Sequence, residues 1–199
     1  ACGISIQSDE KSDSASSAQA LCGIAYNLDL PETIGVRKKL LPEEGKMSQI
    51  AMSAMDDWGG EIAEQDKPVI VIIEGLTMYL SEEDVKKIFS IISKRFERVT
   101  VLVETMNPTM VKRMKEKSIE GSNAKFIWGV KNGEELAKLL PNFRLVEEHS
   151  LAEGMAEFIA IFKLLSKIKP VSNISNRIVV LESGSLYNVK KNPHYAAFV

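Results

Sequence analysis

Acidic side chains follow three of the most apolar segments of this 199-residue chain. Asp29 follows CGIAYNL, Glu74 follows VIVII at 69–73, and Glu104 follows VTVLV at 99–103. An ionised carboxylate is costly to bury without a partner, so each acid must reach solvent, a hydrogen-bond donor or a bound cation. At the end of a nucleotide-binding strand, a carboxylate can accept hydrogen bonds from ribose hydroxyls. These acids are therefore candidates for ligand binding, and the alternative for each is a solvated strand end or a helix cap.

Alternating strand and helix patterns must position these acids. Apolar runs predict strands at 22–28, 47–55, 69–73 and 99–104, and less uniform ones at 143–151 and 177–183. Apolar spacing and start signals predict helices at 32–41, 57–65, 81–96, 107–118, 133–140 and 152–168. Because the first four strands are mostly continuous apolar runs, we expect a parallel sheet covered on both faces, with antiparallel pairing only among the last strands. In such a sheet, ligands bind outside the carboxyl ends of the strands.

The capping signals are local and specific. Ser81 and Asp84 resemble a capping box, with Asp in place of the usual Glu, and predict the start of the helix at 81–96. Asn107 and Pro108 supply an N-cap and a proline at the first helical position of the next helix.

Composition narrows the class of protein. Hydrophobic residues make up 45% and charged residues 26% of the chain, ordinary values for one α/β domain, which we expect at 1–183 before a polar tail at 184–199. The formal net charge of -2 gives no electrostatic case for nucleic acid. No apolar run approaches the roughly 20 residues that span a bilayer, and no secretory signal opens the chain. Cys2 and Cys22 form no CxxC motif, so a reduced, cytoplasmic protein is expected without a metal site.

Other catalytic patterns are weaker. Gly3 could belong to a glycine turn, but neither GxGxxG nor a Walker motif is present. Tyr187 and Lys191 match the YxxxK spacing of short-chain reductases, yet they lie in a polar tail without helical character. His149 and His194 fit structural roles better than catalytic ones. Neither a Ser-His-Asp triad nor a glycosidase acid pair can be assembled.

Several segments together resemble a known family. YNLDLPETIGVRKKLL, SAMDDW, KPVIVIIEGLTMYLSEEDVKKIF, AKFIWGV and SNRIVVL are similar to the leucine carboxyl methyltransferase family, in particular its bacterial polyketide-type O-methyltransferase branch. The resemblance runs from about Ala25 to Leu181. It implies a Rossmann-like class I methyltransferase fold, α/β, with a mostly parallel seven-stranded sheet and one antiparallel strand. It also implies S-adenosylmethionine as the cofactor.

The resemblance further implies roles for matching positions. Asp29 matches the acid expected on the ribose hydroxyls of the cofactor, and Glu74 the acid near its methionine part. Ser53 and Ala54 match the segment along the adenine. Tyr79 lies on the loop near the site of methyl transfer and is the candidate catalytic residue, while Gly3 in ACG looks like a remnant of the glycine motif after the first strand.

The N-terminal part departs from the family pattern. Family members carry a GCGxDTR-like motif, whereas this chain has ACGIS, with Ser5 at the Asp position and no matching Arg. The first, central strand and the N-terminal helical segment are absent from the sequence. If the central strand were missing, backbone N–H and C=O groups of the neighbouring strands would stay unpaired. Each unpaired group would cost about 1–3 kcal/mol of stability. We therefore expect either a longer biological chain or a shortened substitute supplied by residues 1–7.

The hypothesis that follows is O-methylation of a small molecule or a carboxyl group. Transfer from a sulfonium is an in-line displacement that needs alignment and exclusion of water more than acid–base groups. An ionised carboxylate acceptor needs no general base, whereas a phenol or alcohol would gain from one. Two alternatives stay open: a degenerate, non-catalytic binding protein of the same fold, and a nicotinamide-dependent oxidoreductase that uses Asp29 for ribose.

Overall fold

A computed structural model describes residues 3–8, 24–41, 47–63, 67–113, 125–152 and 175–184. The strands are β1 (Gly3–Ser8), β2 (Ala25–Asp29), β3 (Met47–Ala51), β4 (Val69–Glu74), β5 (Val99–Thr105), β6 (Arg144–Ser150) and β7 (Arg177–Ser183). The α-helices are α1 (Pro31–Leu40), α2 (Glu82–Arg95), α3 (Pro108–Arg113) and α4 (Gly133–Leu139), and the 3-10 helices are η1 (Trp58–Glu61) and η2 (Thr77–Tyr79).

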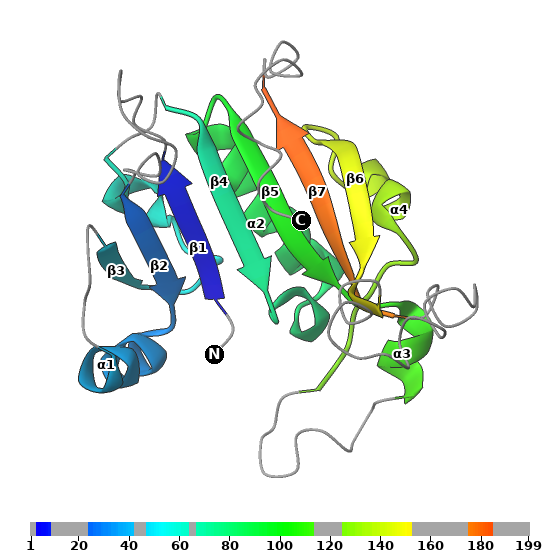
Figure 1. Ribbon diagram of the computed structural model, residues 1–199, viewed down its shortest axis with the longest axis horizontal. Helices are drawn as coiled ribbons and strands as arrows, with labels where there is room; N and C mark the ends of the chain where they lie inside the picture. Colours follow the sequence, from blue (N-terminus) through cyan, green and yellow to red (C-terminus); the bar gives the residue numbers. More distant parts are fainter. Residues whose placement is uncertain are drawn as a thin grey trace, which may run out of the picture.

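The described strands form one sheet in the order β3-β2-β1-β4-β5-β7-β6 (Figure 1). The pairs β2/β3 and β4/β5 are parallel, while β7 is antiparallel to both β5 and β6. β1 is antiparallel to both of its neighbours, β2 and β4. The expectation of one antiparallel strand is therefore wrong, because β1 and β7 both run against the other five.

The direction of β1 agrees with its register and with its sequence pattern. Gln7 lies opposite Ala25, so the end of β1 and the start of β2 meet at the same edge of the sheet. The sequence GISIQS also alternates apolar and polar residues, as is typical of antiparallel strands. Gly3–Ser8 thus forms a central strand of the sheet, in agreement with the expectation that residues 1–7 supply a shortened substitute for the first strand.

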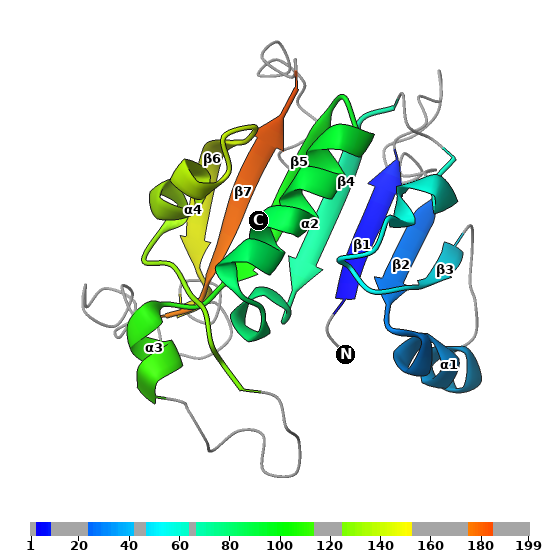
Figure 2. The same cartoon turned by 180° about the vertical axis from the view of Figure 1, so that it is seen from behind.

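Helices α2 and α4 pack against one face of the sheet and form the hydrophobic core with it (Figure 2). α2 contributes Val85, Ile88, Phe89 and Ile92 to the main hydrophobic cluster, which also contains the inward residues of β4, β5 and β7. Burying such side chains contributes roughly 1.5–3 kcal/mol each. The capping box of α2 is confirmed: Ser81 Oγ accepts from the Asp84 N–H, and Asp84 Oδ2 accepts from the Ser81 N–H.

Other element predictions differ from the structure at their ends. The strand predicted at 47–55 ends at Ala51, and the helix predicted at 57–65 is reduced to η1 within the described part. The strand predicted at 22–28 is β2, so Asp29 closes the strand itself. The N-cap at Asn107 is confirmed, since its Oδ1 accepts from the Thr109 N–H. The helix predicted at 152–168 lies outside the described residues apart from Ala152.

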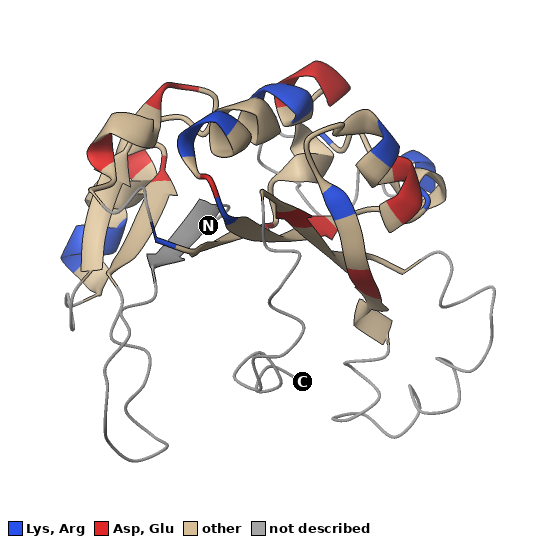
Figure 3. Cartoon of the chain, turned by 90° about the horizontal axis from the view of Figure 1, so that it is seen from above, with Lys and Arg blue, Asp and Glu red and all other residues tan. Residues whose placement is uncertain are grey.

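Charges of both signs are interspersed over the helices (Figure 3). At the start of α2, the Lys86 ammonium hydrogen-bonds the Glu82 carboxylate and lowers the pKa of that carboxyl. Within the described residues, no helix combines the length and the apolar character that a membrane span requires. The described residues also include no group of three or more His, Cys, Asp or Glu side chains suited to a metal ion.

Candidate functional site

Two of the predicted acids, Asp29 and Glu74, lie level with each other at the same edge of the sheet. Gly3 is paired with Glu74, and Ile4 lies opposite both Leu28 and Ile73. Asp29, the residue after Leu28, is thus level with Gly3 and Glu74. Neighbouring strands are ~4.8 Å apart, so the backbones of Asp29 and Glu74, two strands apart, are separated by roughly 10 Å. The sheet order also reverses here, because β2 and β3 extend to one side of β1 and β4 to the other.

Gly3 reaches this edge by an unexpected route. The resemblance places the glycine remnant after a parallel strand, whereas the structure places Gly3 at the start of an antiparallel one. Reversal of the strand exchanges its two ends. The first residue of β1 therefore lies where the residue after a parallel strand would lie, between the ends of β2 and β4.

Glu74 is an exposed carboxylate at the end of β4. Among the described residues it has no hydrogen-bond or ion-pair partner, although the strand that carries it is buried at alternate positions. Gly75 follows at φ 62°, a left-handed conformation that L side chains adopt rarely. The glycine turns the chain away from the sheet direction and leaves the carboxylate facing outward at the sheet edge.

Asp29 is half-buried and has one carboxylate oxygen engaged. Its Oδ1 accepts from the Leu30 N–H at 2.8 Å, and its backbone carbonyl accepts from the Met52 N–H at 3.1 Å. Among the described residues, Oδ2 has no hydrogen-bond partner. Asp29 fits the alternative of a helix cap only in part. The N-cap residue of α1 is Leu30, and no side chain caps the helix there.

Ser53 and Ala54 lie in a tight turn after β3. Ser53 Oγ accepts from the Met55 N–H, and the Ser53 N–H donates to Asp56 Oδ2. The Ala54 carbonyl accepts from the indole N–H of the fully buried Trp58 at 3.0 Å. β2 and β3 lie on the same side of β1 in the sheet. The turn after β3 and Asp29 at the end of β2 are therefore on the same side of the point where the strand order reverses.

Tyr79 packs in a second, smaller hydrophobic cluster beyond the end of β4. Its ring lies 5.0 Å from that of Phe126, centroid to centroid, with an interplanar angle of 34°. The buried members of this cluster are Met78, Met106, Val111 and Phe126. The Met78 carbonyl accepts from the Ile127 N–H at 2.9 Å, which holds segment 125–130 against η2. The AKFIWGV segment is thus brought beside the loop that carries Tyr79.

Glu104 is the acid that the resemblance left without a role. Its Oε2 accepts from the Gly75 N–H at 3.0 Å, and its Oε1 accepts from Asn176 Nδ2 at 2.8 Å. Its backbone carbonyl accepts from the buried Thr77 hydroxyl at 2.7 Å. The signal that could have found it is the pattern that found Glu74, an acid directly after a buried strand. Glu104 faces hydrogen-bond donors, whereas Glu74 faces outward.

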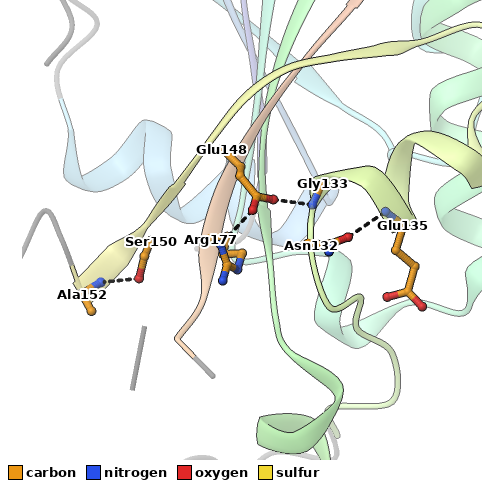
Figure 4. A network of polar contacts seen from close by, with 7 residues as sticks. All are labelled: Asn132, Gly133, Glu135, Glu148, Ser150, Ala152 and Arg177. Carbon is orange, nitrogen blue, oxygen red and sulfur yellow. Dashed lines mark hydrogen bonds and ion pairs between the residues drawn. The ribbon is translucent and has the colours of Figure 1, made fainter. Parts of the chain in front are cut away.

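A second acid network ties β6, β7 and α4 together (Figure 4). Glu148 Oε2 accepts from the Gly133 N–H at the start of α4, and Glu148 Oε1 accepts from Arg177 Nη1 at 3.0 Å. Asn132 Oδ1 accepts from the Glu135 N–H and caps the same helix. The Arg177 side chain is 13% exposed. All of these contacts are internal, so this network stabilises the β6/β7 end of the sheet.

Comparison with known proteins gives one related sequence and a shared fold. The chain is 26% identical over 130 residues to the tetracenomycin polyketide synthesis O-methyltransferase TcmP of Streptomyces glaucescens, a match covering 64% of this chain and 48% of TcmP. The chain therefore spans about half the length of this curated relative. No protein-family model matches the chain.

Among solved structures, one from Thermobifida fusca YX, described provisionally as a methyltransferase, superposes with a TM-score of 0.56 at 12% identity. The superposition covers 80% of this chain and 63% of that one. At this level of identity the likeness shows the fold alone. The fold is thus shared with that structure, and the predicted resemblance to a polyketide-type O-methyltransferase agrees with the sequence similarity to TcmP.

Proposed function

We propose that the chain binds S-adenosylmethionine at the carboxyl edge of β2 and β4 and transfers its methyl group to an oxygen of a small molecule or a carboxyl group. The observation that carries this proposal is the row formed by Asp29, Gly3 and Glu74 at the point where the sheet order reverses. Open α/β sheets bind their ligands at this point. The sequence similarity to TcmP supports the choice of reaction.

The residues present suit this cofactor. Oδ2 of Asp29 has no partner among the described residues and can accept hydrogen bonds from ribose hydroxyls. Glu74 is exposed, unpaired within the described part and negative, and would attract the cationic methionine end. Ser53 and Ala54 would lie along the adenine, where the turn fixed by Trp58 gives the segment a defined backbone. Because Gly3 has no Cβ, the cofactor can approach the backbone of β1 closely at the position between Asp29 and Glu74.

When bound, the cofactor supplies an electrophilic methyl group on a sulfonium. The chain's own residues would then align the acceptor and exclude water. Tyr79, packed on Phe126 at the end of η2, is the residue we assign to the acceptor side of the site. An ionised carboxylate acceptor would need no proton transfer, whereas a phenol would deliver its proton to a base or to solvent.

The cofactor class is tested by thermal shift with S-adenosylmethionine and with NAD. S-adenosylmethionine should raise the unfolding temperature and NAD should not, because ligands that bind only the folded state stabilise it by mass action. Asp29→Ala should abolish the shift, while Asp29→Asn, which keeps an acceptor for the Leu30 N–H, separates loss of charge from loss of the turn. A shift with NAD alone would favour the oxidoreductase alternative.

The reaction is tested by the release of S-adenosylhomocysteine in the presence of candidate acceptors. A panel of phenols, alcohols and carboxylates distinguishes the acceptor classes. Binding of the cofactor together with no turnover on any acceptor, in a chain that is fully folded, would favour the non-catalytic alternative.

A further inference from the structure

The Glu104 carboxylate lies at the centre of a hydrogen-bonded chain behind the proposed cofactor site. It accepts from the Gly75 N–H on one side and from the Asn176 amide on the other, at 3.0 and 2.8 Å. Asn176 is itself held, because its carbonyl accepts from the Leu151 N–H at 2.9 Å. The chain Asn176–Glu104–Gly75 therefore connects the start of β7, the end of β5 and the turn after β4.

The turn at Gly75 decides where the Glu74 carboxylate lies. The Glu74 carboxylate makes no hydrogen bond or ion pair among the described residues, so its position depends on the backbone on either side. On one side the β4 ladder fixes Ile73 against Val103. On the other side, Gly75 is at φ 62°, and the partner of its N–H is the Glu104 carboxylate. Thr77, whose hydroxyl donates to the Glu104 carbonyl, anchors the next residues of the same turn.

We propose that Glu104 is a positioning residue for cofactor binding, acting through Gly75 on Glu74. This inference rests on the proposed function, since Glu74 is the group assigned to the cofactor. Both carboxylate oxygens of Glu104 accept from groups of the chain itself, Gly75 and Asn176, so we assign it a positioning role and no part in the reaction. Its contribution is to hold the turn that presents the exposed acid.

Because one of the two donors that face Glu104 is a side chain, the inference can be tested by substituting residues 104 and 176 singly and together. An ionised carboxylate accepts from both donors, whereas an amide offers one acceptor and one donor. In Glu104→Gln the amide oxygen can still accept from the Gly75 N–H only if the NH₂ group faces Asn176, whose amide must then turn to present its Oδ1. Adding Asn176→Asp supplies an acceptor at that position without the turn. The introduced amide at position 104 can then donate to the introduced carboxylate at position 176, while its oxygen accepts from the Gly75 N–H.

The experiment measures the Kd for S-adenosylhomocysteine by calorimetry. Glu104→Gln should weaken binding by about tenfold, the usual effect of losing one charge-assisted hydrogen bond. The pair Glu104→Gln with Asn176→Asp should return the Kd to within about threefold of the original. With an acceptor in hand, Glu104→Gln should raise the KM for S-adenosylmethionine and leave kcat nearly unchanged.

Glu148→Gln is the matched control. Glu148 also accepts from a backbone N–H, that of Gly133, and from a side chain, that of Arg177. Its loss should lower stability and leave the Kd unchanged. Equal effects of Glu104→Gln and Glu148→Gln on the Kd would overturn the inference, because Glu104 would then act only through general stability.

Amide exchange at Gly75, followed by NMR in the ligand-free protein, does not depend on cofactor binding. The Gly75 amide should be protected, lose protection in Glu104→Gln and recover it in the double variant. A Gly75 amide that exchanges as freely as an exposed one in the unaltered protein would overturn the inference, whether or not the variants fold. Absence of cofactor binding alongside a protected Gly75 amide would instead contradict the proposed function.

Discussion

At the scale of single residues, the two strand-end acids on β4 and β5 show how neighbouring carboxylates acquire different roles. Glu74 closes β4 and Glu104 is the penultimate residue of the adjacent parallel strand β5, yet Glu104 accepts hydrogen bonds from Gly75 and Asn176 while Glu74 stays exposed. Sequence alone predicted both acids as candidates from the same pattern. It could not separate them, because the donors of Glu104 lie 29 and 72 residues away along the chain.

Glu74→Gln should weaken S-adenosylmethionine binding by about tenfold, since the amide loses the charge attraction to the cationic ligand. Because Glu74 is exposed and unpaired in the described part of the chain, the free energy of unfolding should change by less than about 0.5 kcal/mol. Calorimetry and urea unfolding measure the two effects. Glu83→Gln, an exposed acid on α2, makes the same charge change away from the site and should leave the affinity unaltered.

At the scale of elements, the short segments beyond the strand ends set the shape of the site. Segment 125–130 is held by bonds to Met78 and Met106 and brings Phe126 onto Tyr79. The strand and helix patterns predicted β4, β5, α2 and α4 well, because each has a clear apolar period or a cap. They could not predict that AKFIWGV packs beside η2, because that placement depends on backbone bonds between segments distant in sequence.

Gly129→Ala should disrupt this arrangement. A Cβ at Gly129 would lie 2.2 Å from the Met106 carbonyl oxygen and 3.0 Å from Val111 Cγ2, so segment 125–130 must move away from the end of β5. We expect a loss of about 1–3 kcal/mol in the free energy of unfolding and a changed near-ultraviolet circular dichroism from the Tyr79–Phe126 pair. Gly60→Ala, where nothing lies within 4 Å of the new Cβ, should change neither quantity.

Ser81→Ala tests the start of α2, which packs across the core. The change removes the acceptor for the Asp84 N–H and should cost about 1 kcal/mol of stability. Urea unfolding with an unchanged m-value would report it as a loss of stability alone. Ser81→Thr keeps an acceptor oxygen, so a Thr variant as unstable as the Ala variant would contradict the capping explanation.

At the scale of the whole molecule, the sheet brings together acids from separate strands around a central strand of unusual direction. The alternating pattern predicted strands, helices and the binding edge, and the resemblance predicted the methyltransferase fold. Neither predicted the antiparallel β1, because strand direction depends on how a segment is connected and paired. Gly3 lies at the expected edge all the same, since reversing the strand exchanges its ends.

The direction of β1 is testable by cross-linking. In the antiparallel register Gln7 lies opposite Ile70, and directly opposed residues have Cα atoms about 4.5–5.5 Å apart, within reach of a disulfide. With Cys2 and Cys22 replaced by Ser, the pair Gln7→Cys and Ile70→Cys should form a disulfide on oxidation. The pair Gln7→Cys and Ile73→Cys should not, and efficient cross-linking of that pair alone would show a parallel strand.

Titration calorimetry with S-adenosylhomocysteine measures directly whether the carboxyl ends of β2 and β4 bind the cofactor. We expect saturable binding at one site per chain, lost in Asp29→Ala and weakened in Glu74→Gln. An absence of binding heat across several temperatures, with the protein shown to be folded by circular dichroism, would contradict it, as would binding that both variants leave unchanged.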